Sequence, residues 1–198
     1  MSLLILASAS PRRAEILRSL GIPFRVRPAN VPEDPLPGET AEEAAARLAA
    51  AKASHIAERE PEAWVLAADT LVFLDGLILG KPRDAADAVA MLRRLSGREH
   101  GVVTALHLTR GSAKGMGHVE ISRVRFAPMD EAEIAWYAAT GEPADKAGAY
   151  GVQGLGARFI EEIHGSFTNV MGLPARAVYR LLRAVPDPAL ASIALSSG

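Results

Sequence analysis

The chain has 198 residues, 49% of them hydrophobic, and this length and composition predict a single domain, residues 1–198, with a sizeable buried core. Its 23 acidic and 22 basic residues nearly cancel to a formal charge of −1, and only 5% of residues are aromatic, so we expect no binding to nucleic acid. The sequence contains no cysteine, which excludes disulfides and thiolate metal sites and favours a cytoplasmic protein.

No segment has the pattern of a membrane anchor. The N-terminal apolar run LLILA is too short for the core of a signal peptide, and arginines follow it where a cleavage site would stand. The apolar segment AWVLAADTLVFL is interrupted by Asp69, unlike a membrane span. We therefore expect no association with a membrane.

Strands and helices alternate in the first half of the chain. Pro11 suits the first turn of a helix, and Thr40 with Glu43 three residues later is a capping-box pattern before an alanine-rich stretch. A DG dipeptide after residue 74 is a hairpin signal. In chain order, these signals predict a strand at 3–7, a helix at 11–20, a strand at 24–28, a proline-rich loop at 30–40, a helix from 41 to about 60, a strand at 64–74 that returns at 77–80, and a helix ending near 97.

The second half adds antiparallel strands to the sheet. GVVTALHLTRG and GHVEISRVRF alternate as two antiparallel strands would, and an acidic-capped helix follows from Asp130 to about Thr140. The remainder predicts a glycine-rich segment, a strand through Ile163, a helix over 174–185 and a small-residue tail that frays from about 187. The predicted fold class is α/β, a mixed twisted sheet flanked by helices.

Residues 6–13, LASASPRR, place serines and arginines at the predicted start of a helix. Unpaired N–H groups and the positive end of the helix dipole favour an anion there. Ser8 and Ser10 can donate hydroxyl hydrogen bonds, and Arg12 and Arg13 carry forked donors that match phosphate oxygens. The alternative is that Ser10 only caps the helix and both arginines are solvated surface residues.

Asp69 lies among apolar residues in AADTLVFLDG, within the predicted interior strand. A lone buried carboxylate is costly, so it needs hydrogen bonds, a cation or a metal ion. As a structural residue it would cap a turn or pair with an arginine. As a functional residue it would bind Mg²⁺ or accept a proton from water.

Four further charged residues are candidates for the same site, although each also has an ordinary interpretation as a solvated side chain. Lys81 follows a strand in LGKPRD, and Glu33 in the proline-rich loop is a candidate second metal ligand. Arg47 and Lys52 interrupt the helix segment RLAAAKA, but five helical residues turn the chain by about 140° beyond one full turn, so both cannot share one narrow stripe. No GxGxxG, GxxxxGK[ST], HExxH or GxSxG motif offers another chemistry, so the set favours metal-assisted attack on a phosphate over acyl transfer.

Several segments together resemble the Maf family of nucleoside triphosphate pyrophosphatases. They are LASASPRRAEIL, the PxExxxPGE-like loop, RLAAAKA, AADTLVFLDGLILGKPRD, MLRRLSGREH, GEPADKAGAYGVQGLGARFIEEIHG and NVMGLP, and they span nearly the whole chain up to about residue 185. The resemblance implies a fold shared with inosine-triphosphate pyrophosphatases, a central phosphate cleft and a homodimer. It also implies a divalent metal cation (Mg²⁺, Mn²⁺ or Co²⁺) and hydrolysis between the α and β phosphates, which yields a nucleoside monophosphate and pyrophosphate.

The same resemblance implies roles for individual residues. Asp69 would be the base that activates water, and Glu33 and Asp69 would carry the metal. The triphosphate would be held by Ser8, Arg12, Arg13, Lys52 and Lys81.

Substrate choice follows from the same resemblance. Thr70 and Gln153 look like the dTTP/UTP branch of the family, and Arg12 is a third position tied to selectivity. The amide of Gln153 can donate and accept, so it can pair with the O4/N3 edge shared by thymine and uracil; the alternative is an amide that only stabilises a loop. Other possible functions are a pyrophosphatase for 7-methyl-GTP or other modified nucleotides, and a nucleotide-sensing regulator of septum formation without turnover.

Overall fold

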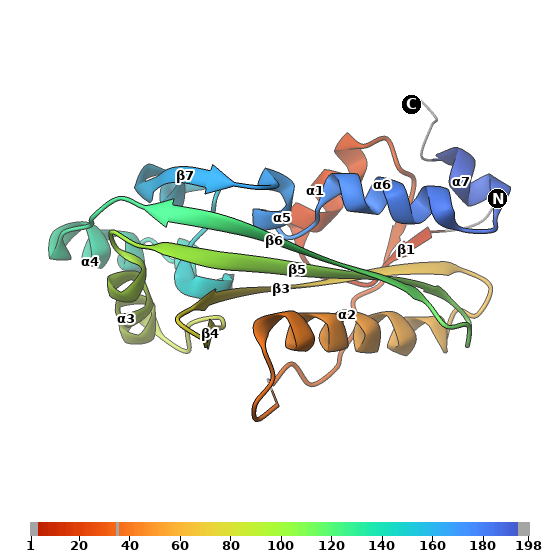
Figure 1. The fold of residues 1–198 in the computed structure, drawn as a ribbon, viewed down its shortest axis with the longest axis horizontal. Coiled ribbons are helices and arrows are strands. Elements are labelled where there is room, and N and C mark those ends of the chain that lie inside the picture. The colour runs from red at the N-terminus through yellow and green to blue at the C-terminus, as the bar shows by residue number, and fades with distance from the viewer. Residues whose placement is uncertain (1–3, 35, 194–198) are drawn as a thin grey trace.

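The computed structural model of the protein describes residues 4–34 and 36–193. Three long strands, β3, β5 and β6, run through the middle of the molecule (Figure 1). In chain order the elements are β1 (Leu4–Leu6), α1 (Pro11–Ser19), β2 (Arg25–Val26), α2 (Ala41–Ala57), β3 (Trp64–Leu74), β4 (Leu77–Leu79), α3 (Ala85–Leu95), β5 (Glu99–Arg110), β6 (Met116–Phe126), α4 (Glu131–Ala139), the 3₁₀ turns η1 (Glu142–Asp145), η2 (Ala147–Ala149) and η3 (Gly154–Phe159), β7 (Ile160–His164), α5 (Phe167–Val170), α6 (Ala175–Ala184) and α7 (Pro188–Ile193).

The strands form one mixed sheet. Their order is β2-β1-β3-β5-β6-β7, and β4 pairs with β3 outside this path. β1 is parallel to both β2 and β3, whereas the other strand pairs are antiparallel. The predicted α/β fold with a mixed sheet flanked by helices is confirmed.

Strand β3 has an unpaired stretch in the middle of one edge. β5 pairs with nearly the whole length of β3, so β1 and β4 must share its other edge. There β1 lies opposite residues 64–66 and β4 opposite residues 72–74. Within the described residues, no strand lies beside 67–71 on that edge. Both Asp69 and Thr70 belong to this open stretch.

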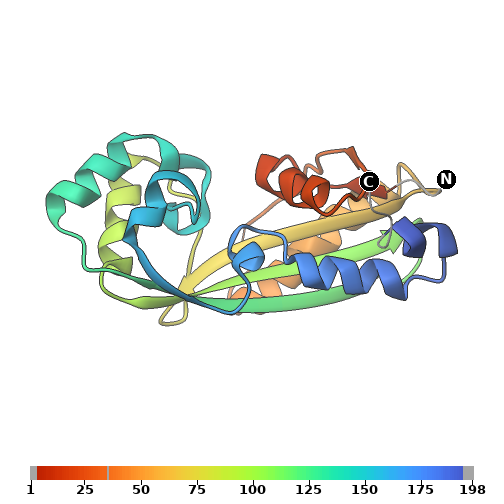
Figure 2. The same cartoon turned by 90° about the horizontal axis from the view of Figure 1, so that it is seen from above.

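One face of β3 supports two separate apolar clusters, because every second side chain of a strand points to the same face. Leu66 and Ala68 pack with α1 and α6, whereas Val72 and Leu74 pack with α3 and α4. Thr70 lies between these two groups. The helix pairs accordingly lie at opposite ends of the long strands (Figure 2).

Helix α2 covers the opposite face of the sheet (Figure 1). Val65 and Ala67 pack against its C-terminal half, and Leu71 and Phe73 against its N-terminal half. Asp69 lies between them. The apolar core is therefore interrupted on both faces of β3 at neighbouring positions.

The predicted start of α2 is confirmed at the level of its hydrogen bonds. Thr40 Oγ1 accepts from the backbone N–H of Glu43 at 3.2 Å, and a Glu43 carboxylate oxygen accepts from the backbone N–H of Thr40 at 2.9 Å. This capping box satisfies two donors that a helix N-terminus leaves unpaired. Asp130 and Glu133 form the same motif before α4.

Two segments differ from the prediction. β2 contains only Arg25–Val26, because its single partner, β1, is itself three residues long. Residues 188–193 form α7 within the expected frayed tail, since Leu190 is buried in the core beside α6. The last five residues of that tail and Leu3 of the first predicted strand lie outside the described residues.

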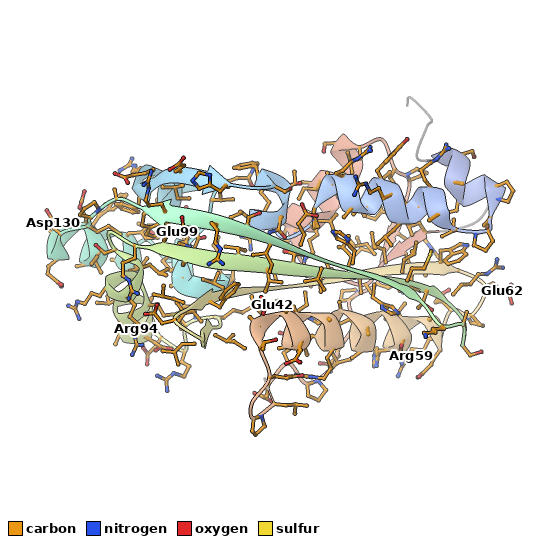
Figure 3. All side chains as sticks on the ribbon, viewed as in Figure 1. Glu42, Arg59, Glu62, Arg94, Glu99 and Asp130 are labelled. Carbon is orange, nitrogen blue, oxygen red and sulfur yellow. The ribbon has the colours of Figure 1, made fainter. Side chains whose placement is uncertain are left out.

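Charged side chains of both signs are spread over the outside of the molecule. Figure 3 labels examples around its periphery, among them Arg59 and Glu62 at one end and Arg94, Glu99 and Asp130 at the other. This mixture matches the near-zero formal charge. Basic side chains can therefore gather at one place only where the fold brings them together from different segments.

In the described part of the chain, none of the helices has the length and apolar character needed to cross a bilayer.

The core at α3 provides a test of the fold. Leu92 is 0% exposed, so we expect Leu92→Ala to lower the free energy of unfolding by about 2–5 kcal/mol, because it removes buried surface and leaves a cavity. Leu77 is 52% exposed, and Leu77→Ala is the matched control with an expected change of about 0.5 kcal/mol or less. Urea unfolding followed by circular dichroism measures both. Equal losses in the two variants would contradict the assigned core.

Candidate active site

A cleft of about 910 Å³ opens where the edge of β3 lacks a neighbouring strand. Its walls come from both ends of the sheet: the start of α1, the proline-rich loop and α2 on one side, and β4 with the turns η1 to η3 on the other. The nine residues that received roles in the sequence analysis all line it: Ser8, Arg12, Arg13, Glu33, Lys52, Asp69, Thr70, Lys81 and Gln153. Segments more than 140 residues apart in sequence thus meet around one space.

Asp69 and Lys52 form a buried ion pair at the base of this cleft. Lys52 lies one helical turn after Leu48 on the buried face of α2, and it is only 7% exposed. Its Nζ donates to Asp69 Oδ1 at 2.6 Å and lies 2.5 Å from Glu33 Oε1. The cation that a buried carboxylate needs is therefore supplied by α2.

Glu33 reaches the same ammonium group from the proline-rich loop. Burial by itself would raise the pKa of Glu33, but the hydrogen bond and charge of Lys52, with the charges of Lys81 and Arg13, outweigh burial and lower that pKa. Lys81 Nζ lies 3.8 Å from Glu33 Oε2, and Lys81 is exposed. Glu33 is accordingly a carboxylate at neutral pH and links the two lysines.

Arg47 does not join the cleft residues. Its guanidinium donates to both carboxylate oxygens of Glu39 and to the backbone oxygen of Asp34. This hydrogen bonding holds the pKa of Glu39 at about 2. Arg47 therefore fastens the proline-rich loop to α2, on a different side of the helix from Lys52.

The start of α1 is built around Ser8 instead of Ser10. Ser10 is the N-cap residue, but its side chain makes no capping hydrogen bond. Ser8 is buried, and its Oγ accepts from the backbone N–H of Ser10 at 3.1 Å and from Arg13 at 3.2 Å. The alternative in which the Ser10 hydroxyl caps the helix and both arginines are simply solvated is wrong.

Arg13 is fixed by hydrogen bonds along its whole guanidinium group. Its Nε donates to the backbone oxygen of Gly172 at 2.8 Å, and NH2 donates to Thr70 Oγ1 at 3.0 Å. Burial lowers the pKa of Arg13, and the nearby charge of Asp69 acts in the opposite direction. The arginine nevertheless stays charged, because a guanidinium group is not deprotonated in proteins.

Glu142 of η1 holds the loop that carries Gln153. Its carboxylate accepts from the backbone N–H groups of Leu155 at 2.9 Å and Gly156 at 3.0 Å, and from the hydroxyl of Tyr137 at 2.8 Å. Burial tends to raise the pKa of Glu142, but these donors outweigh it and the pKa is lowered. Gln153 is exposed on the cleft wall directly before this anchored segment.

Lys146 is a cleft cation that the sequence analysis did not single out. Its Nζ donates to the backbone oxygen of Glu142 and to Asp145 Oδ1, both at 2.6 Å, and it lines the cleft. Its position in the glycine-rich DKAG segment was the sequence signal that could have identified Lys146 as a candidate. With Arg12, Arg13, Lys52 and Lys81, it is one of five cations in the lining, which stand beside five carboxylates: Glu33, Asp34, Asp69, Glu142 and Asp145.

The carboxylates of the cleft fit a metal ion that is bound partly by the protein and partly by a substrate. In the described residues, no group of three or more His, Asp or Glu side chains gathers as a complete metal site. Glu33 and Asp69 do present carboxylates to one point, now bridged by Lys52 Nζ. Mg²⁺ commonly binds through one or two carboxylates plus phosphate oxygens of a substrate, so two carboxylates suffice.

Comparison with known proteins gives the family. The family model described as "Maf-like protein" matches residues 3–185, which is most of the chain. This chain belongs to the Maf family. The recognition made from the sequence motifs is confirmed.

Several curated proteins are similar to this chain over nearly their whole length. A protein of Symbiobacterium thermophilum named "dTTP/UTP pyrophosphatase" is 50% identical over 92% of this chain and 93% of its own length. One of Aquifex aeolicus with the same name is 49% identical over 90% and 93%. A solved HAM1 protein from Coxiella burnetii is 16% identical over 98% of this chain and 91% of its own, with a TM-score of 0.49, too low to carry an argument.

The Glu142 anchor provides a test of the cleft wall. Glu142→Gln replaces an acceptor oxygen with an amide donor, so at least one of the three donors loses its partner. We expect about 1–3 kcal/mol less protection of the Leu155 and Gly156 amides, measured by native-state hydrogen exchange. Glu99→Gln, at an exposed residue on β5, is the matched control. Unchanged protection in Glu142→Gln would show that the carboxylate does not hold this loop.

Proposed function

We propose that this protein hydrolyses dTTP and UTP to the nucleoside monophosphate and pyrophosphate. The observation that carries the proposal is the buried ion pair of Asp69 and Lys52 at the base of a cleft with further arginines and lysines in its walls, in a member of the Maf family. Relatives 49–50% identical over nine-tenths of the chain, named dTTP/UTP pyrophosphatases, support the choice of substrates.

Arginine and lysine side chains of the cleft bind the triphosphate. Arg13 and Lys52 are held in place before substrate arrives, whereas Lys81 is exposed and free to follow a phosphate. Ser8 and the open N-terminus of α1 add hydrogen-bond donors, and Arg12 adds charge beside them. Fixed donors of this kind stabilise the charge that develops on phosphate oxygens during transfer.

Asp69 is the base that accepts a proton from the attacking water. The water then adds to phosphorus as pyrophosphate leaves, which breaks the bond between the α and β phosphates. Phosphate oxygens compete with Asp69 and Glu33 for Lys52, so substrate binding draws Nζ away and leaves Asp69 Oδ1 free to accept the proton.

Glu33 and Asp69 would hold a divalent cation, Mg²⁺, Mn²⁺ or Co²⁺, together with the triphosphate. When bound, the metal neutralises phosphate charge and polarises the phosphoryl oxygens. Glu33 keeps its charge at neutral pH for this purpose, since the hydrogen bond and charge of Lys52, with the charge of Lys81, outweigh burial and lower its pKa.

Gln153 and Thr70 select the base, with Arg12 as a third contributor. The Gln153 amide lies on the exposed cleft wall, where its donor and acceptor match O4 and N3–H of thymine or uracil.

The chain acts as a single Maf domain, forms a homodimer and works in the cytoplasm, with neither nucleic acid nor a membrane as its partner.

The role of Asp69 is tested by Asp69→Asn, which keeps the shape of the side chain but removes the base. We expect kcat for dTTP and UTP to fall by about a hundredfold or more, measured as metal-dependent pyrophosphate release. Asp75→Asn is the matched control, because Asp75 is exposed at the β3–β4 turn, away from the cleft lining. A mutant that keeps wild-type kcat would exclude Asp69 as the base.

The same assay on wild type compares dTTP, UTP, CTP, GTP and 7-methyl-GTP. Preference for 7-methyl-GTP would overturn the choice of substrate and leave the mechanism in place. If the protein binds nucleotides but hydrolyses none of them, the proposed enzyme activity is wrong and a nucleotide-sensing function takes its place.

The role of Gln153 is tested by Gln153→Glu, which keeps an acceptor but loses the donor for O4. We expect the ratio of kcat/KM for dTTP over CTP to fall about tenfold or more, since the carboxylate can accept from the amino group of cytosine. Gln153→Asn keeps both functions on a shorter side chain and serves as the control. An unchanged ratio in Gln153→Glu would mean that Gln153 does not contact the base.

A further inference from the structure

A polar pair crosses from β3 to β5, with half-buried Thr70 on the cleft wall and buried Thr104 behind it. Thr70 and Thr104 lie directly opposite each other in the antiparallel register, and their hydroxyl oxygens are 2.9 Å apart. Thr104 is 0% exposed and interrupts the apolar run VVTAL of β5. A buried hydroxyl at this position is costly unless it is hydrogen-bonded. Its hydrogen-bond partners therefore explain how Thr104 is tolerated there.

The proton of each hydroxyl in this pair can be assigned from its partners. Thr104 Oγ1 donates to the backbone oxygen of Asn169 at 3.0 Å, and a hydroxyl has a single proton to give. Thr104 must therefore accept from Thr70. Arginine can only donate, so Thr70 accepts from Arg13 NH2 at 3.0 Å. The chain of donors runs in one direction, from Arg13 through Thr70 and Thr104 to the oxygen of Asn169.

This chain closes into a ring. The oxygen of Asn169 also accepts from the backbone N–H of Gly172 at 2.8 Å, and the oxygen of Gly172 accepts from Arg13 Nε at 2.8 Å. Gly172 has φ +105°, and a Cβ there would lie 3.3 Å from Thr70 Oγ1 and 3.5 Å from Arg13 Nε. Glycine at 172 therefore lets the turn after α5 approach both groups.

Asn169 anchors the far end of the ring to the sheet. It is 0% exposed, and its side-chain amide donates to the backbone oxygen of Val102 at 3.0 Å and to Ser122 Oγ at 2.9 Å. Val102 lies on β5 and Ser122 on β6, so the acceptor at the end of the chain is fixed to two central strands.

From this arrangement we infer that Thr104 is a positioning residue for Arg13, acting through Thr70. Thr70 is fixed with its proton toward Thr104, so its oxygen can only accept on the side that faces the cleft. In this structure the Thr70 hydroxyl oxygen therefore accepts a hydrogen bond from Arg13, whatever further contact it makes with the substrate base. The inference rests on the proposed function, because Arg13 is placed there among the groups that bind phosphate.

The test is a double-mutant cycle between Arg13 and Thr104. Thr104→Val removes the hydroxyl at similar volume, and we expect kcat/KM for dTTP to fall about tenfold. Thr104→Ser keeps the hydroxyl and should restore the wild-type value. In the Arg13→Ala background, Thr104→Val should have almost no further effect, because the residue through which it acts is gone.

Losses that multiply in the double mutant would overturn the inference, since Thr104 would then act independently of Arg13. Failure of Thr104→Ser to restore activity would also overturn it. If Thr104→Val does not fold, as judged by circular dichroism, Thr104→Ala replaces it in the same cycle.

A second readout separates this inference from the proposed function. The affinity for inorganic pyrophosphate can be measured by calorimetry without turnover. The four proteins of the cycle are compared: wild type, Thr104→Val, Arg13→Ala and the double mutant. If wild type binds pyrophosphate without hydrolysing any nucleotide, the proposed function fails while the cycle still tests the ring. If wild type hydrolyses dTTP but Thr104→Val changes neither quantity, the inference alone fails.

Discussion

Two adjacent polar residues in the central strand set the arrangement of this molecule. Asp69 and Thr70 point to opposite faces of β3 and interrupt its apolar contacts at the same level. A buried carboxylate or hydroxyl is tolerated only with partners. Each neighbouring element therefore supplies one: α2 brings Lys52, α1 brings Arg13, and β5 brings Thr104.

The same interruption separates the two ends of the molecule and creates the cleft. β1 and β4 stop short of each other along one edge of β3, so substrate can approach Asp69 and Thr70 from that side. One wall comes from α1, the proline-rich loop and α2, and the other from β4 and the turns η1 to η3. In a chain with a formal charge of −1, the fold turns five lysines and arginines into this one space, where five carboxylates lie beside them.

Much of the fold was predictable because its signals are local. Three examples are the limits of β3 at Trp64 and Leu74, the capping box at Thr40 and the acidic start of α4 at Asp130. The antiparallel pairing of β5 with β6 follows in the same way from alternation within a few residues. α7 was not predictable in this way, because its order depends on burying Leu190 beside α6. The same holds for β2, whose length depends on its only partner strand.

By itself, the sequence determined the family and most of the helices and strands, because these have signatures in short runs of residues, and motifs shared with that family named nine of the residues that line the cleft. It did not identify Thr104, Asn169 or Glu142, whose partners lie on other elements. Arg13 and Gly172, for example, are 159 positions apart in sequence, yet they share a hydrogen bond. Only the tertiary structure decided these contacts, because strand register and helix packing fix which buried donors meet which acceptors.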